Sequence, residues 1–383
     1  MDSMTEQTAE RPGDGARFFD SRQKYLLFVT TCNEKRVIAR RVAAELDRLR
    51  PAPPALRIFD AGVGNGAVLT RVLRACHARH PHVPLYAVGK EISIEDVRLA
   101  LDRMPDRFHE HPATVLVLTN MPYADAPWLS PRSAEAAERL VWHELALSGS
   151  CAHTFDEEIT ALEPLLTEHW RTRTSPKTGN PLPERPAVLV IYRRDHAFLL
   201  DSILPRREAP RADFDLVIAS QPYRLRVPAE TKAARVLAPL SRALRPGGRL
   251  LAIHARGGDP GQEIVERVWP GENPFVHDRH VMLQATREAL GAEADAFGFE
   301  AGTDQEALFR YAMHSLPSET AGPLGTSTLF AAWNAAVYVA QIDEARASAA
   351  VADGRYAEAT RAVLRERGGL WFNDEAFAIA RRG

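Results

Sequence analysis

The sequence predicts an α/β protein built on a doubly wound, mostly parallel sheet of seven strands. Three observations lead to this prediction. Short apolar strands alternate with helical segments over residues 56–119, a glycine-rich turn follows the first of these strands, and similar strands return at 214–219 and 249–253. Two candidate final strands, 309–313 and 370–379, complete the expected sheet.

The composition supports a globular fold. The 383 residues are 45% hydrophobic and 26% charged, which is enough apolar material for a sizeable core. Lys and Arg number 48 against 50 Asp and Glu, and this near-neutral balance excludes a globally basic nucleic-acid-binding protein. The sequence has no apolar run of about 18 residues and no apolar signal core, so we expect neither a membrane partner nor secretion. Cys32, Cys76 and Cys151 are too widely spaced for a disulfide framework, which favours a cytoplasmic location.

The first half of the chain alternates helix and strand. The first helix should end before the proline-rich segment 51–54, and Ser93, with Asp96 three residues later, has the spacing of a helix N-cap. The expected elements are helices over 21–49, 67–78 and 94–104 and strands over 56–60, 85–89 and 114–119.

Two long insertions interrupt this pattern and are expected to form a cap over the sheet. In the first we expect helices over 133–147 and 156–170, a loop over 173–186 and a strand over 187–192; in the second, mostly helix. A helix over 230–244 should precede the fifth core strand. The expected organisation is a disordered tail (1–18), a first half of the core domain (19–125), the first insertion (126–212), a second half of the core (213–316), a helical insertion (317–369) and the last strand (370–383).

The strongest motif is the turn after the first strand, where Asp60, Gly62, Gly64 and Gly66 have the spacing D-x-G-x-G-x-G. Glycines let the backbone approach a ligand closely, and the turn leads into a helix N-terminus. The spacing differs from the G-x-G-x-x-G of dinucleotide-binding proteins. A carboxylate inside the turn suits a cationic amine better than a pyrophosphate.

On these residues the chain resembles the class I S-adenosylmethionine-dependent methyltransferases, and the resemblance implies their Rossmann-like fold with an antiparallel last strand. Asp60, Gly62, Gly64 and Gly66 match the family's first motif, which holds the methionine part of the cofactor S-adenosylmethionine. Glu91, after the second strand, matches the acid that accepts hydrogen bonds from the ribose hydroxyls. The segment 244–251 matches the family's helix–turn–strand before the fifth strand.

The resemblance also assigns the adenine contact, with two alternatives. Asn120 and Met121 follow the third strand, where the family usually has Asp. In a competing register, the strand over 188–192 is the third one and Asp195 takes the adenine role. We prefer Asn120, because the helix over 94–104 then joins the second and third strands through loops of ordinary length.

The fourth strand supplies the candidate catalytic loop. Ala219 ends this strand as a candidate cofactor contact, and Ser220, Gln221 and Tyr223 faintly resemble the (Asp/Asn/Ser)-Pro-Pro-Tyr loop of amino-group methyltransferases. His254 and His314 are the histidines expected to reach the cleft as candidate general bases, and for each of them a structural histidine with satisfied hydrogen bonds is the alternative, favoured for either one alone. Tyr25 is a candidate lid over the cofactor, and an ordinary packing helix is the alternative.

These residues predict an enzyme that transfers a methyl group from S-adenosylmethionine to a nitrogen or oxygen of a small molecule, without a metal. Alternatives are a cofactor-binding sensor or partner module without transfer, an N-methyltransferase of a nucleic acid or protein, and a transferase of another group such as aminopropyl. Whether the chain forms a homodimer is left open.

Overall fold

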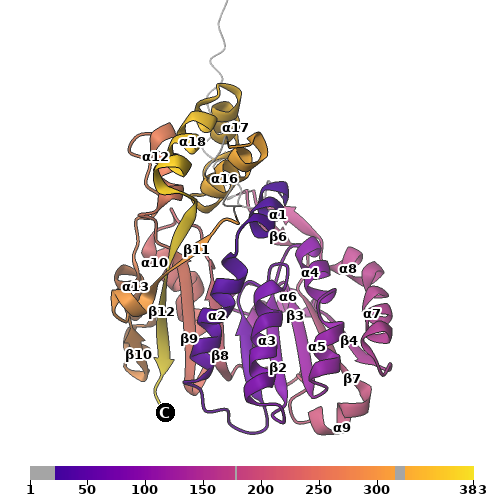
Figure 1. Ribbon diagram of the computed structural model, residues 1–383. Coiled ribbons are helices and arrows are strands. Elements are labelled where there is room, and N and C mark those ends of the chain that lie inside the picture. The colour runs from indigo at the N-terminus through magenta and orange to yellow at the C-terminus, as the bar shows by residue number, and fades with distance from the viewer. Residues whose placement is uncertain (1–21, 177–178, 315–323) are drawn as a thin grey trace, which may run out of the picture.

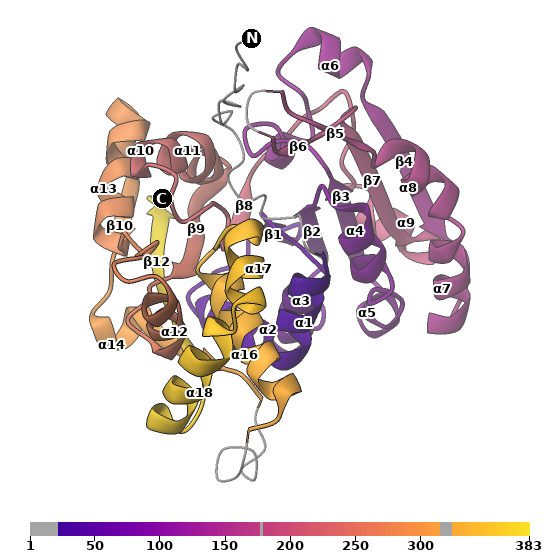
Figure 2. The ribbon, with the colours of Figure 1, turned by 90° about the horizontal axis from the view of Figure 1, so that it is seen from above.

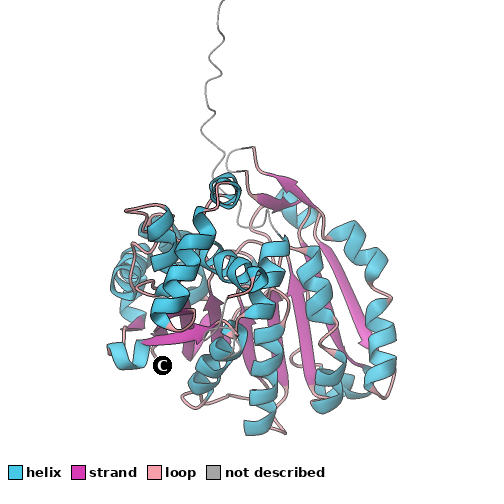
Figure 3. Ribbon diagram, turned by 45° about the horizontal axis from the view of Figure 1, so that its top comes forward, coloured by secondary structure: helices cyan, strands magenta, loops and turns pink. Residues whose placement is uncertain are grey.

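The computed structural model describes residues 22–176, 179–314 and 324–383. In this part of the chain ten strands form one sheet, in the order β10-β12-β9-β8-β1-β2-β3-β7-β4, and β11 pairs with β12 (Figures 1 and 3). The strands are β1 (Leu56–Asp60), β2 (Leu85–Lys90), β3 (Thr114–Thr119), β4 (Val141–Leu147), β7 (Ala187–Arg193), β8 (Phe214–Ser220), β9 (Leu244–Ala255), β10 (Phe297–Glu300), β11 (Leu308–Ala312) and β12 (Trp371–Arg381). The predicted doubly wound α/β sheet is therefore confirmed, and it has three strands more than expected.

Helices cover both faces and the carboxyl edge of this sheet. The α-helices are α1 (Arg22–Thr31), α2 (Glu34–Leu46), α3 (Ala67–Arg79), α4 (Ile94–Leu101), α5 (Pro105–Glu110), α6 (Ala134–Glu138), α7 (Ala152–Thr160), α8 (Glu163–His169), α9 (Ala197–Leu200), α10 (Ala229–Lys232), α11 (Ala238–Arg242), α12 (Pro260–Val268), α13 (Arg279–Leu290), α14 (Asp304–Ala307), α16 (Thr326–Val339), α17 (Glu344–Ala352) and α18 (Arg355–Arg367). Short turns of other helix types are η1 (Ala126–Trp128), η2 (Arg194–His196), η3 (Ala233–Leu237) and η4 (Gly291–Ala296).

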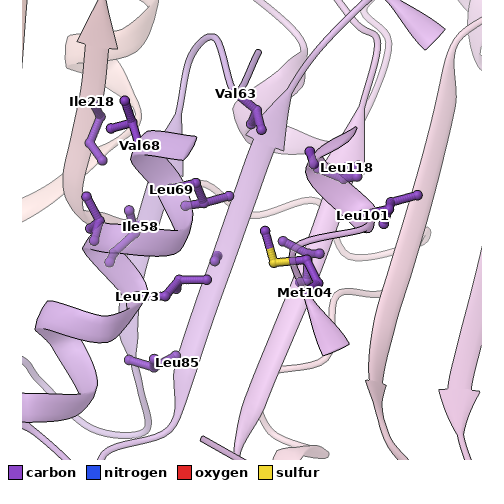
Figure 4. Close-up of a cluster of buried hydrophobic side chains, with 14 of the residues drawn as sticks. Ile58, Val63, Val68, Leu69, Leu73, Leu85, Leu101, Met104, Leu118 and Ile218 are labelled. Atoms are coloured by element: carbon purple, nitrogen blue, oxygen red, sulfur yellow. The ribbon is translucent and has the colours of Figure 1, made fainter. Parts of the chain in front are cut away.

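The central strands β8, β1, β2 and β3 are buried on both faces, which explains their continuous apolar sequences. Successive side chains point to opposite faces, so Ile58 and Phe59 belong to different core clusters. Figure 4 shows the first cluster, in which Ile58 lies with Leu69 and Leu73 of α3. The parallel centre directs the loops after β1, β2, β3 and β8 to one edge.

The last strand, β12, runs antiparallel to its neighbour β9, as the family resemblance implies. Two more strands, β10 and β11, also pair antiparallel with β12. We predicted β11 but not β10, which is four residues long and follows directly on the helical turn η4.

The helix predicted over 133–147 is wrong in its second half, because 141–147 forms β4. This strand pairs in parallel with β7, and β7 pairs antiparallel with β3. The cross-strand pairing outweighs the helical tendency of the Glu144–Leu147 stretch. The first insertion thus widens the main sheet, and it also places a small hairpin of β5 (Thr172–Thr174) and β6 (Pro181–Pro183) within the expected loop.

The long helix predicted over 21–49 is broken into α1 and α2 at Cys32 and Asn33. Here Asn33 accepts a hydrogen bond from the Ala312 backbone at 2.9 Å, and its own N–H donates to the Ala312 carbonyl at 3.0 Å. These bonds to the end of β11 replace the helical ones. The helix over 156–170 is likewise divided into α7 and α8, and the helix over 230–244 contains the π-helical turn η3.

The described part of the second insertion is helical, as predicted. The helices α16, α17 and α18 gather with α12 above the sheet, and α1 lies beside α16 (Figures 1 and 2). The predicted tail, 1–18, and residues 315–323 lie outside the described residues. No helix among the described residues is both long enough and apolar enough to cross a membrane.

We predict that Gly66→Ala destabilises the fold far more than Gly354→Ala. Both glycines cap a helix N-terminus with positive φ, 75° and 80°. A Cβ at Gly66 would lie 2.8 Å from Cα of Ala100, whereas at Gly354 it meets nothing within 4 Å. Chemical denaturation should therefore show that the free energy of unfolding falls by about 2–4 kcal/mol in Gly66→Ala and by about 1 kcal/mol in the control, Gly354→Ala. Equal losses would contradict the close packing of α3 on α4.

Candidate active site

A cavity of about 1320 Å³ lies at the carboxyl edge of the parallel strands. Open α/β sheets bind ligands at this edge, where the connections of neighbouring strands diverge. The loops after β1, β2, β3 and β8 line the cavity, and both insertions contribute, the first with Trp170 and the second with Tyr338. In Figure 2 the sheet is seen from this edge, with α16 and β6 on different sides of the strand ends.

The glycine turn between β1 and α3 forms part of the cavity wall. Gly62 and Gly64 line the cavity, and a Cβ built on Gly62 would meet nothing within 4 Å. The turn is fixed to the sheet by the Ala61 N–H, which donates to the Ile218 carbonyl of β8 at 2.8 Å. The strand end therefore presents bare backbone to the cavity, as the glycine spacing predicts.

Asp60 is buried beneath this turn with an incomplete set of hydrogen bonds. Its Oδ1 accepts from the Gly62 N–H at 3.1 Å, but its Oδ2 has no hydrogen-bond partner among the described residues. Burial raises the pKa of Asp60 to about 6, and the nearby Lys35 only partly offsets this effect. A buried carboxylate oxygen without a partner is costly, and this one lies directly beneath Gly62, which lines the cavity.

Glu91 follows β2 and joins the glycine turn to the next loop. Its Oε2 accepts from the Gly64 N–H at 2.9 Å, and its Oε1 accepts from the N–H groups of Ile92 and Ser93 at 2.8 and 2.9 Å. Burial and the charge of Asp96 raise the pKa of Glu91. A carboxylate has about four acceptor positions, so these three bonds leave room for one more donor from the cavity, which Glu91 lines.

The structure does not bring Asn120 and Met121 to the cavity. The Asn120 side chain accepts from the Ala187 N–H at 2.9 Å and donates to the Arg185 carbonyl at 3.1 Å, so its amide binds the backbone leading into β7. Met121 is a buried core residue. The cavity is lined instead by the next residues, including Tyr123.

The structure does not bring the alternative adenine contact, Asp195, to the cavity either. Because β7 runs antiparallel to β3, Tyr192 pairs with Val115 at the opposite edge of the sheet. Asp195 lies beyond that end, where Arg193 and His196 pair with it. Burial slightly opposes its charge, but the hydrogen bond from Arg193 holds the pKa of Asp195 well below its usual range.

The loop after β8 lines the cavity, but not all of its predicted site residues have side chains that are free to contact a ligand. Ser220, Gln221 and Tyr223 all line the cavity. Gln221 has a positive φ of 48°, and its amide is held by Asp374 of β12 at 3.3 Å and by the Ala255 N–H at 3.2 Å. Gln221 therefore anchors the loop to the sheet. Ala219, before it, is a fully buried core residue.

Tyr223 and His254 form one end of a buried hydrogen-bonded chain. The Tyr223 hydroxyl lies 2.8 Å from Nδ1 of His254, and Nε2 of His254 lies 2.9 Å from Oε1 of Glu375. His254 is buried and reaches the cavity only through Tyr223. His314 is exposed and is not among the cavity residues; its N–H donates to the Thr31 carbonyl at 2.7 Å.

The helices α1 and α16 close the cavity above the glycine turn. The Tyr25 hydroxyl lies 3.0 Å from where a Cβ on Gly64 would be, and its ring is 6.1 Å from that of Tyr338. Lys35 of α2 lies beside both rings and pairs with Glu34 at 2.9 Å. Burial opposes its charge, but Glu34 and the two tyrosines raise the pKa of Lys35 above its ordinary value.

Several residues at the cavity wall or behind it were not predicted as site residues from the sequence. Lys90 lies 4.8 Å above the Tyr123 ring, and the Tyr123 hydroxyl donates to the Pro222 carbonyl at 3.0 Å. Tyr338 lies in the second insertion, which the motifs of the resembled family do not cover. Glu375 left one signal in the sequence, a charged pair with Asp374 inside an otherwise apolar strand. No group of three or more metal-ligating side chains occurs in the described part of the chain.

No protein-family model matches the chain, and no curated protein matches it. Solved structures do match. A geranyl diphosphate methyltransferase in complex with GPP and sinefungin is 14% identical, covering 90% of this chain and 77% of its own, with a TM-score of 0.32. A loganic acid methyltransferase with SAH is 11% identical, covering 94% of each chain, with a TM-score of 0.33. Phosphoethanolamine N-methyltransferase 2 from Haemonchus contortus is 13% identical over 90% of this chain and 53% of its own, with a TM-score of 0.31.

These TM-scores describe loose superpositions, so the assignment of the fold rests on features of this chain. The parallel strands run in the order β9-β8-β1-β2-β3, the last strand is reversed, and a glycine turn joins β1 to α3. The chain therefore has a doubly wound, Rossmann-like α/β fold with a reversed last strand, which is the fold that its resemblance to the class I S-adenosylmethionine-dependent methyltransferases implies.

Proposed function

We propose that this chain transfers a methyl group from S-adenosylmethionine to a small-molecule acceptor. The observation that carries the proposal is the unpartnered Oδ2 of the buried Asp60, next to the open space at Gly62. An amino-acid ammonium group would supply the donor that this oxygen lacks. The bare backbone at Gly62 leaves room for the rest of the amino-acid part.

Glu91 is the residue best placed to hold the sugar of the same ligand. It lies one hydrogen bond from the glycine turn and keeps acceptor capacity toward the cavity. The acceptor position that Glu91 keeps can take a hydrogen bond from one hydroxyl of the ribose diol. Ile92, Pro122 and Trp170 line the cavity near Glu91 and offer apolar surface for the base, in place of the Asn120 side chain.

The size of the cavity supports a small acceptor beside the cofactor. Small-molecule sites usually measure about 300–1,000 Å³, and this cavity of about 1320 Å³ has space for a second molecule. Both insertions contribute to its wall, the first through Trp170 and the second through Tyr338. A recessed site that the insertions help to build suits a small acceptor better than a polymer.

When bound, S-adenosylmethionine supplies a methyl group already activated by its sulfonium centre. The task of the chain is then to hold the acceptor in line with the methyl–sulfur bond. Ser220 and Tyr223 are the polar side chains of the β8 loop that can orient it, while Gln221 keeps that loop fixed to β12.

We predict that Asp60→Ala and Gly62→Val each abolish binding of S-adenosylmethionine in titration calorimetry. The first removes the acceptor for the ammonium group, and the second fills the open space at the turn with a side chain. Gly298→Val is a matched control, because a Cβ there meets nothing closer than 3.9 Å and lies on the edge strand β10. Unchanged affinity in both site variants, with folding intact, would contradict the proposed site.

Cofactor binding should weaken in acid. Asp60 must be ionised to hold an ammonium group, and its pKa of about 6 means that protonation competes below this value. From about pH 7 to about pH 5 the Kd should rise about tenfold. Asp60→Asn should remove most of this dependence along with most of the affinity. A wild-type Kd that stays constant over this range would argue against Asp60 as the ammonium acceptor.

The same carboxylate should lower the stability of the protein without ligand. The pKa of Asp60 is raised from 3.8 to about 6 on folding, so its ionised form costs stability above pH 6, and the cost disappears below the unfolded value. The gain in unfolding free energy of Asp60→Asn over wild type should therefore grow by about 2.4 kcal/mol from about pH 4 to about pH 7.5. Urea denaturation at the two pH values measures this difference, and a pH-independent difference would contradict it.

A further inference from the structure

We propose that the acceptor carries a hydroxyl group, and that its proton is removed through Tyr223 to His254, with Glu375 holding the histidine. This inference rests on the proposed function and deepens it by naming the substrate class and the base. Tyr223 is the member of the chain that lines the cavity, so it is the one that can touch the acceptor. His254 and Glu375 lie behind it, away from the ligand.

The hydrogen bonds fix which nitrogen of His254 carries the proton. Oε1 of Glu375 lies 2.9 Å from Nε2 of His254, and a carboxylate can only accept. Nε2 is therefore the N–H, and Nδ1 is the acceptor that faces the Tyr223 hydroxyl at 2.8 Å. The Tyr223 hydroxyl then donates to His254, which leaves its oxygen lone pairs for a donor in the cavity.

Glu375 is held ionised by a second partner. Arg279 donates to it twice, from its backbone N–H to Oε1 at 2.9 Å and from Nη1 to Oε2 at 3.1 Å, and Arg256 lies 3.8 Å away. Burial alone would raise the pKa of Glu375, but the hydrogen bonds from His254 and Arg279 hold it below its usual range. A carboxylate that stays charged can balance an imidazolium when His254 takes up a proton.

The placement of this pair is unusual for a purely structural contact. His254 and Glu375 are cross-strand partners of β9 and β12, with the apolar pair Ile253 and Ala376 on one side and the pair Ala255 and Asp374 on the other. They are 2% and 0% exposed, and an apolar pair in such a position is generally no less stable than a buried ionic one. Among the described residues, the cavity-lining group that hydrogen-bonds to this pair is the Tyr223 hydroxyl.

The groups around Tyr223 favour transfer of a proton through its hydroxyl over formation of a phenolate anion. Burial raises the pKa of Tyr223, so it stays a neutral phenol. Nζ of Lys232 lies 5.0 Å from the ring centroid, and this lysine also contacts the Leu225 carbonyl at 2.7 Å and His277 at 3.1 Å. Burial lowers the pKa of Lys232 to about 8, so its charge is weakened in alkaline solution.

In the proposed step, transfer of the methyl group is coupled to transfer of two protons. A lone pair of the acceptor oxygen forms the O–CH₃ bond as the methyl–sulfur bond breaks, and the electron pair of that bond stays on sulfur as a neutral thioether. The acceptor proton passes to the Tyr223 oxygen while the Tyr223 proton passes to Nδ1 of His254. The resulting imidazolium faces the Glu375 carboxylate and returns its proton to solvent through Tyr223 after product release.

This relay can be tested by measuring the transfer of a radiolabelled methyl group from S-adenosylmethionine to two phenols. At about pH 8.5 the hydroxyl of 4-methylphenol is protonated, as that of a tyrosine is, whereas 4-nitrophenol is already ionised and needs no base. Wild type should methylate both. Tyr223→Phe should lower kcat for 4-methylphenol by about 10²–10³-fold and leave that for 4-nitrophenol within about threefold. Glu375→Gln, which keeps the shape but removes the charge, should show the same selectivity with a smaller loss.

Tyr123→Phe is the matched control. Tyr123 also lines the cavity, but its hydroxyl donates to the Pro222 carbonyl and to no base, so its loss should affect the two phenols equally. Equal losses on both phenols in Tyr223→Phe would overturn the relay. Transfer to neither phenol by a wild type that binds S-adenosylmethionine in calorimetry would overturn the hydroxyl acceptor alone. Absence of that binding would overturn the proposed function itself.

Discussion

The buried carboxylate of Asp60 defines the candidate site. One of its oxygens accepts a hydrogen bond from the glycine turn, and the other has no hydrogen-bond partner among the described residues. Such a group costs stability, and proteins usually avoid it or supply a partner. Its location at the end of a central parallel strand gives the cost a function. The fold holds an unsatisfied acceptor directly beneath Gly62, which lines the cavity, and a donor from a bound ligand would offset the cost of its burial.

The carboxylate of Glu91 differs from that of Asp60 in how its hydrogen bonds are satisfied. Both carboxylates are buried at the same sheet edge, yet Glu91 accepts three backbone N–H groups and stabilises the loop that carries it. Glu91 therefore combines a structural task with its spare acceptor capacity. The helices α1 and α16, far apart in the sequence, close the space above both residues with Tyr25 and Tyr338. The cavity is thus a joint product of the core sheet and of the second insertion.

Much of the core could be predicted from local sequence. The bounds of the strands β1 and β3 were predicted correctly, because their apolar runs end at a glycine turn and at Asn120, and the cap at Ser93 is present, with its side chain accepting from the Asp96 N–H. The strand β4 could not be identified, because its stability comes from pairing with residues of β7 that lie 46 positions further along the chain. The break at Asn33 has a similar cause, since its partner lies at the end of β11.

The candidate site was predictable where backbone geometry defines it and less so where distant side chains do. Asp60 and Glu91 occupy the expected strand ends, while Asn120 turned out to bind the backbone before β7, a strand whose direction local sequence does not reveal. Glu375 reaches His254 through the antiparallel pairing of β12 and β9, which joins residues 121 positions apart. Side-chain partners at that separation depend on the folded topology.

A crystal structure of the chain with S-adenosylhomocysteine would test the central claim most directly. The account predicts its amino group within hydrogen-bond distance of Oδ2 of Asp60, its backbone against Gly62, and its ribose hydroxyls against Glu91. A ligand bound in the cavity with Asp60 Oδ2 still unpartnered, or with its sugar away from Glu91, would contradict the account.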